Sequence, residues 1–352
     1  MTDWLAGMQQ TFEYYTVDPI TWRDVSRIPN IKTSTVNRDM QVETLGSATI
    51  DTTEMLGETY VRIYLVTVQN GIKERHPLAT VLVQTPSSNY DGLIRSVSMD
   101  AYTPLLELKE KYPPLGYFAP KGTNVLDFAY ERTRENLRAP VIKPDCEETL
   151  YDDFVAETGE GWLSYNTSLI NYAKFSYGLD PLGQVLFVPN RDIDAMTPIW
   201  TYNDDNSSIL HSSVSMEHDL FGIPNVVEVI YSSGGSNFYS RVENRDPNSP
   251  TSIQNRGREI PHRVTNLNMV GTPTQAMIDE YATQLLKEKS SVAYTVTFTH
   301  GYCPVTIGDC VRLNYTRAGI TDIKGKVISQ SIKCEPGCPV TEKVVYLAKL
   351  WG

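Results

Sequence analysis

The sequence predicts a mainly β protein in which two antiparallel β-barrel domains flank a small α+β insert. β-branched and aromatic runs of strand length recur through residues 22–100 and again from residue 214 onward. Between them, proline and glycine punctuation accompanies two segments with helical periodicity. We therefore expect a first β-barrel over residues 1–112, the insert over 113–200, and a second β-barrel with one helix and a cysteine-rich rim over 201–352.

Composition limits the class of protein. A chain of 352 residues with 41% hydrophobic residues can form two or three domains with real cores. The net charge of −11 argues against a dedicated nucleic-acid binder, because phosphate neutralisation needs clustered lysine and arginine. No apolar run approaches the roughly 20 residues of a membrane span, and the N-terminus lacks the features of a signal peptide. We expect a protein made and kept in a cytoplasm, without stable membrane insertion.

The first barrel is predicted from alternating runs and one hairpin. Residues 60–68 place alternate side chains on opposite faces, as a half-buried strand does. Asn70-Gly71 follows directly and is typical of a tight hairpin, so residues 76–85 are the expected partner strand. Residues 1–20 carry aromatics without a clear period and are expected to form an arm. Further strands are expected at residues 33–36, 47–51 and 94–100.

The insert is predicted to contain two helices and a short strand. Thr123 can cap a helix that ends before Ala139-Pro140. A second helix is expected over residues 162–177, with Gly178 as its C-terminal stop. The strand is expected at residues 184–188.

The second barrel is predicted to contain one clear helix. Thr272 is its expected cap and Pro273 its first residue, and an apolar stripe leads to Lys287 and Lys289 at the negative end of the helix dipole. The strands that follow are expected to form an up-and-down meander. The expected strands of this region are residues 225–231, 238–243, 293–299, 311–315, 326–333 and 340–349.

Four of the five cysteines lie in the last 50 residues, at Cys303, Cys310, Cys334 and Cys338. In a meander the first and third connections lie at the same end, so all four thiols are expected at one rim. Four thiolates favour zinc or an iron–sulfur cluster over harder ions. However, neither pair has the two-residue spacing of a typical zinc ribbon, so buried cysteines without any metal remain the alternative. An odd number of cysteines in a chain of this length does not indicate a disulfide framework.

Several phrases resemble the hub proteins of tailed bacteriophages. The resemblance covers nearly the whole chain, through diffuse structural motifs rather than one diagnostic signature. For the first tube domain they are Gly46-Ser-Ala-Thr-Ile, Tyr60-Val-Arg-Ile-Tyr-Leu, Leu82-Val-Gln-Thr-Pro-Ser and Ala101-Tyr-Thr-Pro-Leu-Leu. For the central domain they are Val125-Leu-Asp-Phe-Ala, Trp162-Leu and Gly183-Gln-Val-Leu-Phe-Val-Pro. For the closing tube domain they are Arg256-Gly-Arg-Glu-Ile-Pro-His, Phe298-Thr-His-Gly-Tyr and Gly308-Asp-Cys-Val-Arg-Leu-Asn-Tyr.

The resemblance implies a baseplate or tail-tip hub without catalytic activity. Such a hub is a homotrimer whose two barrels per subunit form a pseudo-sixfold ring, which joins the hexameric tail tube to trimeric parts. The implied partners are a distal tail or tube protein, a tape-measure protein, and a spike or fibre protein. DNA passes through the lumen without specific binding, and the protein resides in the virion tail after assembly in the host cytoplasm. Some tail-tip proteins of this group hold a cysteine-ligated iron–sulfur cluster, which favours that cofactor at the four cysteines.

Two other functions remain open from the sequence. A cell-wall hydrolase using paired acids is conceivable, although the chain has no Gly-rich phosphate loop, no HExxH and no GxSxG. His262 and His300 are expected near the rim, where a lone histidine beside strands is more often structural. A receptor- or glycan-binding role could use exposed members of the 21 tyrosines. For the hub, the acidic net charge predicts a lumen with few lysines and arginines.

Overall fold

A computed structural model describes most of the chain. The described residues are 2–93, 95–150, 152–205, 208–218, 220–233, 236–265 and 274–349. The prediction of a mainly β protein is confirmed, with 47% strand and 16% helix. The chain divides into two compact units: unit 1 comprises residues 1–214 and 297–344, and unit 2 comprises residues 215–296 and 345–352. Among the described residues, no helix has both the length and the apolar character needed to cross a membrane.

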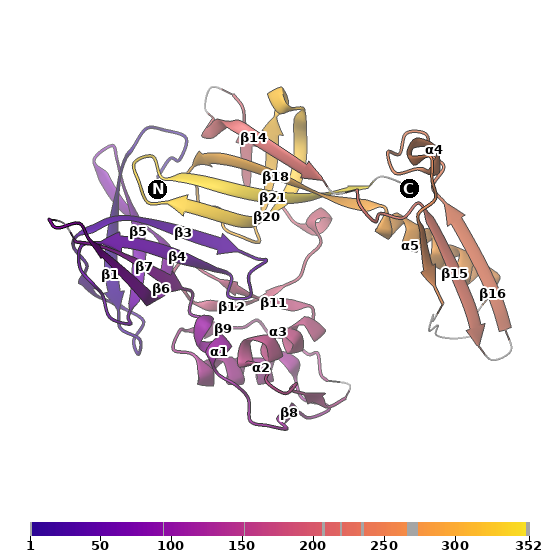
Figure 1. Ribbon diagram of the computed structural model, residues 1–352, viewed down its shortest axis with the longest axis horizontal. Helices are drawn as coiled ribbons and strands as arrows, with labels where there is room; N and C mark the ends of the chain where they lie inside the picture. The colour runs from indigo at the N-terminus through magenta and orange to yellow at the C-terminus, as the bar shows by residue number, and fades with distance from the viewer. Residues whose placement is uncertain are drawn as a thin grey trace. The chain divides into compact units, whose positions relative to one another are not determined.

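The N-terminal part of unit 1 is an antiparallel sheet (Figure 1). Its strands are β1 (Gln9–Val17), β2 (Asp24–Arg27), β3 (Ile31–Asp39), β4 (Gly46–Thr52), β5 (Tyr60–Gln69), β6 (Ile72–Tyr90) and β7 (Arg95–Tyr102). They lie in the order β3-β4-β7-β6-β5-β1-β2. The predicted hairpin at Asn70-Gly71 is present, because Gln69 pairs with Ile72 across it. The predicted strands at residues 33–36, 47–51 and 60–68 lie within β3, β4 and β5, while Ile94 lies outside the described residues.

The N-terminal residues belong to the sheet, so the prediction of an arm is wrong. β1 pairs with β5 along its whole length, and the hydroxyl of Tyr14 hydrogen-bonds to that of Ser34 inside the core. The aromatic pattern showed no period because a carboxylate occupies a buried position next to Tyr14. Glu13 is 8% exposed and is paired with Lys73 at 3.0 Å and Arg75 at 3.1 Å.

The insert packs two helices against one face of a three-stranded sheet. Its elements are α1 (Leu106–Glu110), β8 (Phe118–Ala119), α2 (Val125–Asn136), β9 (Val141–Ile142), β10 (Phe154–Val155), α3 (Trp162–Tyr172), β11 (Phe175–Leu179), β12 (Val185–Pro189) and the 3₁₀ helix η1 (Ile193–Ala195). α2 begins one residue later than predicted, because the side chain of Asn124 accepts the capping hydrogen bond from the amide of Asp127. Tyr177 of β11 and Phe187 of β12 lie in the same apolar cluster as residues of α2 and α3.

The second helix of the insert ends earlier than predicted. α3 stops at Tyr172, and Lys174 takes a left-handed backbone conformation with φ of 62°. The chain therefore reverses into β11, where Gly178 pairs with Leu186 of β12. Gly178 is a strand residue and not a helix stop. A side chain there would collide with Val188, so the glycine serves the packing of the sheet face.

The C-terminal strands form a sheet with a different order from the predicted meander. The strands are β13 (Trp200–Asn203), β14 (Leu210–His218), β18 (Ser291–Gly301), β19 (Cys310–Tyr315), β20 (Ile320–Lys333) and β21 (Pro339–Lys349), with the 3₁₀ helix η2 (Thr316–Ala318) after β19. The neighbour of β18 is β21 rather than β19, and β19 lies between β20 and β13. The meander prediction failed because the connection over residues 302–309 is long enough to carry the chain past two strands. Alternation within a strand does not specify its neighbours.

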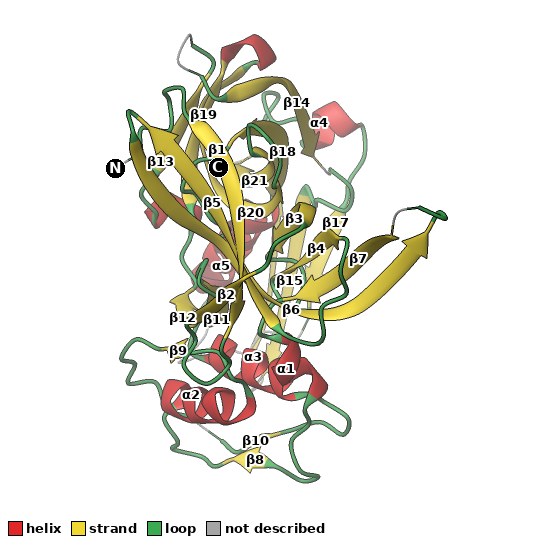
Figure 2. Ribbon diagram, turned by 90° about the vertical axis from the view of Figure 1, so that its left-hand side faces the viewer, coloured by secondary structure: helices red, strands yellow, loops and turns green. Residues whose placement is uncertain are grey.

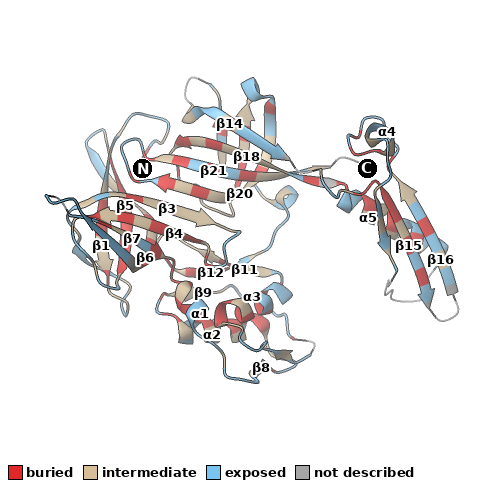
Figure 3. Cartoon of the chain, viewed as in Figure 1, coloured by how far each residue is buried: buried red, intermediate tan, exposed pale blue. Residues whose placement is uncertain are grey.

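Unit 2 contains a three-stranded sheet and one long helix. Its elements are β15 (Val226–Ser233), β16 (Ser236–Glu243), α4 (Ile253–Arg256), β17 (Pro261–Val264) and α5 (Gln275–Lys289). α5 packs on β15 through Ile278, Ala282 and Leu286, and Figure 3 shows buried positions of β15 in red. The predicted cap Thr272 and first residue Pro273 lie outside the described residues. Thr274 accepts the capping hydrogen bond from Met277.

The close packing of β3 against β4 depends on Gly46, and a substitution there would test it. Its φ of 144° is unfavourable for a residue with a side chain, and an added Cβ would overlap the carbonyl oxygen of Asn37 on β3. We expect Gly46→Ala to lower the free energy of unfolding by more than about 1 kcal/mol. Urea denaturation would measure the change. Gly7, whose surroundings are open, provides the control Gly7→Ala, which is expected to change little.

Candidate functional site at the seam between the two β regions

The two β regions of unit 1 join directly by strand pairing. β20 pairs antiparallel with β3, from Ser329 opposite Asp39 to Lys333 opposite Thr35. This pairing merges the two regions into one sheet of 13 strands in the described part of the chain, and Figure 1 shows β20 in yellow beside β3 in indigo. We call this pairing and the buried side chains next to it the seam.

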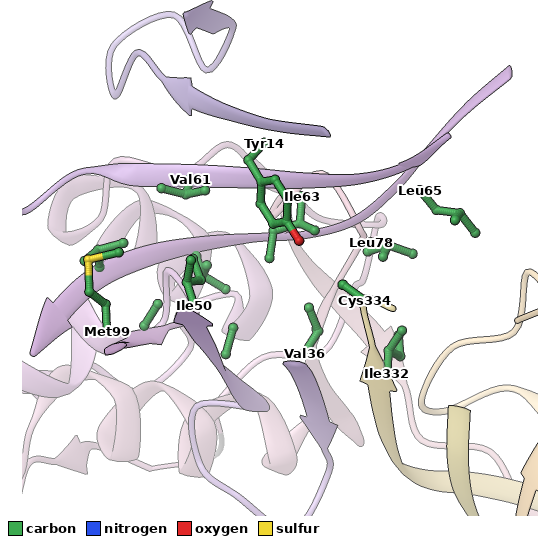
Figure 4. Close-up of a cluster of buried hydrophobic side chains, with 14 of the residues drawn as sticks. Tyr14, Val36, Ile50, Val61, Ile63, Leu65, Leu78, Met99, Ile332 and Cys334 are labelled. Atoms are coloured by element: carbon green, nitrogen blue, oxygen red, sulfur yellow. The ribbon is translucent and has the colours of Figure 1, made fainter. Parts of the chain in front are cut away.

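The apolar core extends across the seam. Ile332 and Cys334, at the end of β20, belong to the same buried cluster as Val36 and Leu78 of the N-terminal sheet. Figure 4 shows these side chains next to one another. The two β regions therefore share one core in addition to their hydrogen bonds.

A chain of polar groups, half-buried at Arg38 and buried at Gln330 and Glu342, also crosses the seam. Arg38 of β3 donates to Gln330 Oε1 of β20 at 2.9 Å and to the carbonyl oxygen of Leu78 at 2.6 Å. The amide of Gln330 in turn donates to Glu342 Oε2 of β21 at 2.7 Å and to the carbonyl oxygen of Val305 at 3.0 Å. The two β regions are thus joined by an uninterrupted series of side-chain hydrogen bonds.

The series ends in a buried ion pair. His300 Nε2 of β18 lies 3.3 Å from Glu342 Oε2, and both side chains are essentially inaccessible. Burial by itself lowers the pKa of His300, but its contacts with Cys303 and Glu342 outweigh that effect and raise the pKa to about 10. The imidazole is therefore protonated at neutral pH. Both ring nitrogens then donate, Nδ1 to the carbonyl oxygen of Gly301 at 2.7 Å and Nε2 to Glu342.

The protonated His300 predicts a loss of stability at alkaline pH. Its pKa in the folded chain lies above the unfolded value of about 6.5. The stabilisation that it contributes is fully present below pH ~6.5 and is lost as the pH rises toward 10. We expect the free energy of unfolding to fall more steeply between pH 7 and pH 10 in the wild type than in His300→Gln. Parallel slopes in the two proteins would contradict the assignment.

Cys303, His300 and Glu342 superficially resemble a catalytic triad, but they cannot act as one here. Cys303 Sγ lies 3.9 Å from His300 Nδ1, yet this nitrogen already donates to the Gly301 carbonyl and cannot take a proton from the thiol. The exposed fraction of Cys303 is 2%, and the other two side chains are fully buried. A nucleophile must reach its substrate, so these residues have a structural role.

The structure brings two of the four predicted metal ligands, Cys334 and Cys338, into one cluster and places Cys310 away from them. Cys303 contacts the hydroxyl of Tyr202 at 3.3 Å, whereas Cys334 and Cys338 lie in the shared core. Cys310 is the first residue of β19 and pairs with Lys326 on β20. Lys326 precedes Cys334 by eight residues, which corresponds to roughly 26 Å along an extended strand. Cys310 is therefore remote from the thiols at the far end of β20.

This spread does not fit a site with four thiolates bound to one metal centre. Zinc–sulfur bonds are about 2.3 Å long, so the four sulfur atoms must converge. Within the part of the chain that is described, no group of three or more His, Cys, Asp or Glu side chains could hold a metal ion. An iron–sulfur cluster or zinc at these cysteines stays a prediction, which metal analysis of purified protein would test.

Sequence reasoning missed Arg38, Gln330 and Glu342, although one signal was present. Glu342 alternates with Val340 and Val344 on β21, and all three are buried. A carboxylate on the same strand face as two buried valines points into the core, and it therefore indicates a buried partner. Of the two histidines expected near the rim, His300 lies in the seam and His262 lies on β17 of unit 2.

Comparison with solved structures shows that the chain is similar in fold to known proteins. A tail protein from Neisseria meningitidis MC58 matches with a TM-score of 0.64 and 14% identity, covering 97% of this chain and 98% of that chain. The 43 kDa tail protein of prophage MuSo2 from Shewanella oneidensis matches with a TM-score of 0.62 and 11% identity, covering 95% and 98%.

A likeness with a lower TM-score is to a complex of two proteins. The Francisella PdpA–VgrG complex matches with a TM-score of 0.56 and 10% identity, and the match covers 98% of this chain but 53% of the other. A scan of protein-family models gives no match, and neither does a comparison with curated proteins. At these identities the likeness shows the fold, and the fold predicted from the resemblance to phage tail hub proteins is confirmed.

Proposed function

We propose that this chain is a structural hub protein of a phage tail or phage-like particle, which joins the tail tube to the tip. The observation that carries the proposal is the seam, where two β regions of one chain pair directly and share a core. A chain built in this way supplies two adjacent tube segments per copy. The likeness to two phage tail proteins over nearly their full lengths supports the same role.

In this role three copies form a ring with six β regions around a channel. Such a ring matches a hexameric tube on one side and trimeric spike or fibre parts on the other, with a distal tail or tube protein and a tape-measure protein as further partners. The protein then resides in the virion tail after assembly in the host cytoplasm. DNA moves through the channel without stable binding, because a net charge of −11 offers no overall neutralisation of phosphates.

Catalysis is not part of the proposal. Cys303, His300 and Glu342 resemble a catalytic centre, but all three side chains are buried and the histidine is engaged by a backbone carbonyl. This network instead links the two β regions through buried side-chain contacts. A receptor- or glycan-binding role has no comparable observation in its favour.

Light scattering coupled to size-exclusion chromatography tests the proposal. A particle with three times the chain mass is expected, and electron microscopy of the same sample should show a ring with a central channel. A monomer at all concentrations would contradict the hub. A ring whose channel is lined mainly by lysine and arginine would contradict the passage of DNA without binding.

A further inference from the structure

The hairpin of β6 and β7 continues beyond the N-terminal sheet as a two-stranded ribbon. β6 pairs with β5 only up to Leu82, and β7 pairs with β4 only from Val97 onward. Beyond these points β6 and β7 pair with each other as far as Tyr90 opposite Arg95. Figure 2 shows the ribbon extending away from the rest of unit 1. A two-stranded ribbon in water is marginally stable, so this one needs a further contact.

The ribbon presents its large apolar side chains at its tip. Tyr90 is 68% exposed and Leu93 is 92% exposed, with the carboxylate of Asp91 between them. The side chain of Asp91 accepts a hydrogen bond from the amide of Leu93, which holds the turn. By contrast, the flanking residues 87–89 are small or polar. Apolar side chains gathered at one exposed point, rather than scattered singly, indicate an interaction site.

A groove of about 380 Å³ lies elsewhere in unit 1. One wall is the outer face of the β11–β12 hairpin, and the opposite wall is the loop before β19. Leu186, Val188 and Ile307 make much of the lining apolar. Gly178 leaves the sheet face flat, because a side chain there would meet Val188. A volume of this size accommodates one or two large side chains.

The groove is also basic. Arg191 and Lys326 line it, and in the described residues neither makes an ion pair with a carboxylate. Asp309 lines it too, but its carboxylate accepts hydrogen bonds from the amide and hydroxyl of Thr306 in its own loop. The groove therefore offers apolar surface with two cationic side chains and one carboxylate, and this net positive lining complements a tip with two apolar side chains and one carboxylate.

We propose that the tip at residues 90–93 of one copy inserts into this groove of a second copy, with Leu93 against Val188 and Asp91 near Lys326. The tip and the groove are different surfaces of the chain, so the contact is heterologous. Heterologous contacts generate rings when the rotation between copies closes. This inference rests on the proposed trimer and names the contact that closes it.

Cysteine cross-linking between differently tagged chains tests the contact. The half-buried Cys146 is replaced by serine in every chain, and the other four native cysteines are buried. Chains carrying Leu93→Cys are co-expressed with chains carrying Val188→Cys and oxidised in the assembled state. We expect a disulfide-linked pair of the two tags at a yield at least tenfold above the control. In the control, Leu115→Cys replaces Leu93→Cys, because Leu115 is 88% exposed in the insert.

Two outcomes overturn the inference, and they are distinguishable. A particle of trimer mass in which the Leu93→Cys yield does not exceed the control refutes the contact and leaves the hub intact. A monomeric mass refutes both. A double-mutant cycle gives an independent readout that spares the fold. Asp91→Asn and Lys326→Gln should each weaken subunit association about two- to fivefold. In the double variant, association should be weakened by less than the product of the two single-variant factors. Additive losses would refute the ion pair.

Discussion

Replacing Glu342 by alanine is expected to cost about 3–5 kcal/mol of folding free energy. The carboxylate accepts hydrogen bonds from Gln330 at 2.7 Å and from Tyr202 at 3.4 Å, and it is paired with His300. Its removal takes the carboxylate acceptor away from His300 Nε2 and from one N–H of the Gln330 amide, in a site that water does not reach. An unpaired buried charge is far more costly than the net gain of the original pair.

Urea denaturation of Glu342→Ala would measure this loss. Glu335 lies exposed in the β20–β21 turn and provides the matched control Glu335→Ala, which should change the unfolding free energy by less than about 0.5 kcal/mol. Glu342→Gln is expected to fall between the two, since one amide oxygen can still accept from Gln330. Equal losses in Glu342→Ala and Glu335→Ala would contradict the assigned role.

The local elements of this protein were largely predictable from its sequence. The Asn70-Gly71 turn and the apolar stripe of α5 appear in the structure. β5 lies where it was predicted, but residues 60–67 are buried on both faces, so the prediction of a half-buried strand is wrong. Predictions failed where tertiary contacts override local pattern. Lys174, in a left-handed conformation, ends a segment that is apolar enough to continue as helix.

The arrangement of strands was not predictable in the same way. β3 pairs with β20 as well as with β4, and Arg38 and Gln330 on β3 and β20 are separated by 292 residues. Alternation assigns a side chain to a face of a strand, but it carries no information about which strand lies alongside. The resemblance to tail hub proteins implied two tube domains, yet not that they pair directly.

The candidate site illustrates the same limit. The cysteines stood out by composition, but composition reports clustering along the chain and not in space. Cys310 lies beside Lys326 of β20, while Cys334 lies in the shared core. Glu342 was the better indicator of the site, because a charged side chain on the buried face of a strand requires a partner.

The insert is also held to the N-terminal sheet by hydrogen bonds that converge on one carbonyl oxygen, and we call this set of contacts the second joint. The oxygen of Leu182, in the turn between β11 and β12, accepts hydrogen bonds from Trp22 Nε1 at 2.8 Å, Thr80 Oγ1 at 2.9 Å and Arg62 Nη2 at 3.3 Å. Gly183 permits the close approach, because a side chain there would meet Thr80. Like the seam, this joint is made of buried polar contacts whose loss leaves unsatisfied groups.

Arg62→Met is therefore expected to cost about 2–4 kcal/mol. The guanidinium is 5% exposed and pairs with Asp24 at 2.8 Å, while its Nε donates to Thr80 at 2.9 Å. Methionine fills a similar volume but removes every donor, so Asp24 loses its cation. The expected loss stays below that of Glu342→Ala because Asp24 is 24% exposed and water can partly solvate it.

The exposed pair Arg312–Asp322 supplies the control for Arg62→Met. Arg312 donates to Asp322 from a side chain that is 41% exposed, so Arg312→Met should change the unfolding free energy by no more than about 1 kcal/mol. Limited proteolysis adds a local readout, because a loosened joint should make the insert between residues 113 and 200 more susceptible to cleavage. If Arg62→Met proved as harmless as Arg312→Met, and the insert stayed as resistant as in the wild type, Leu182 and Asp24 would be held by other contacts and the joint would not depend on Arg62.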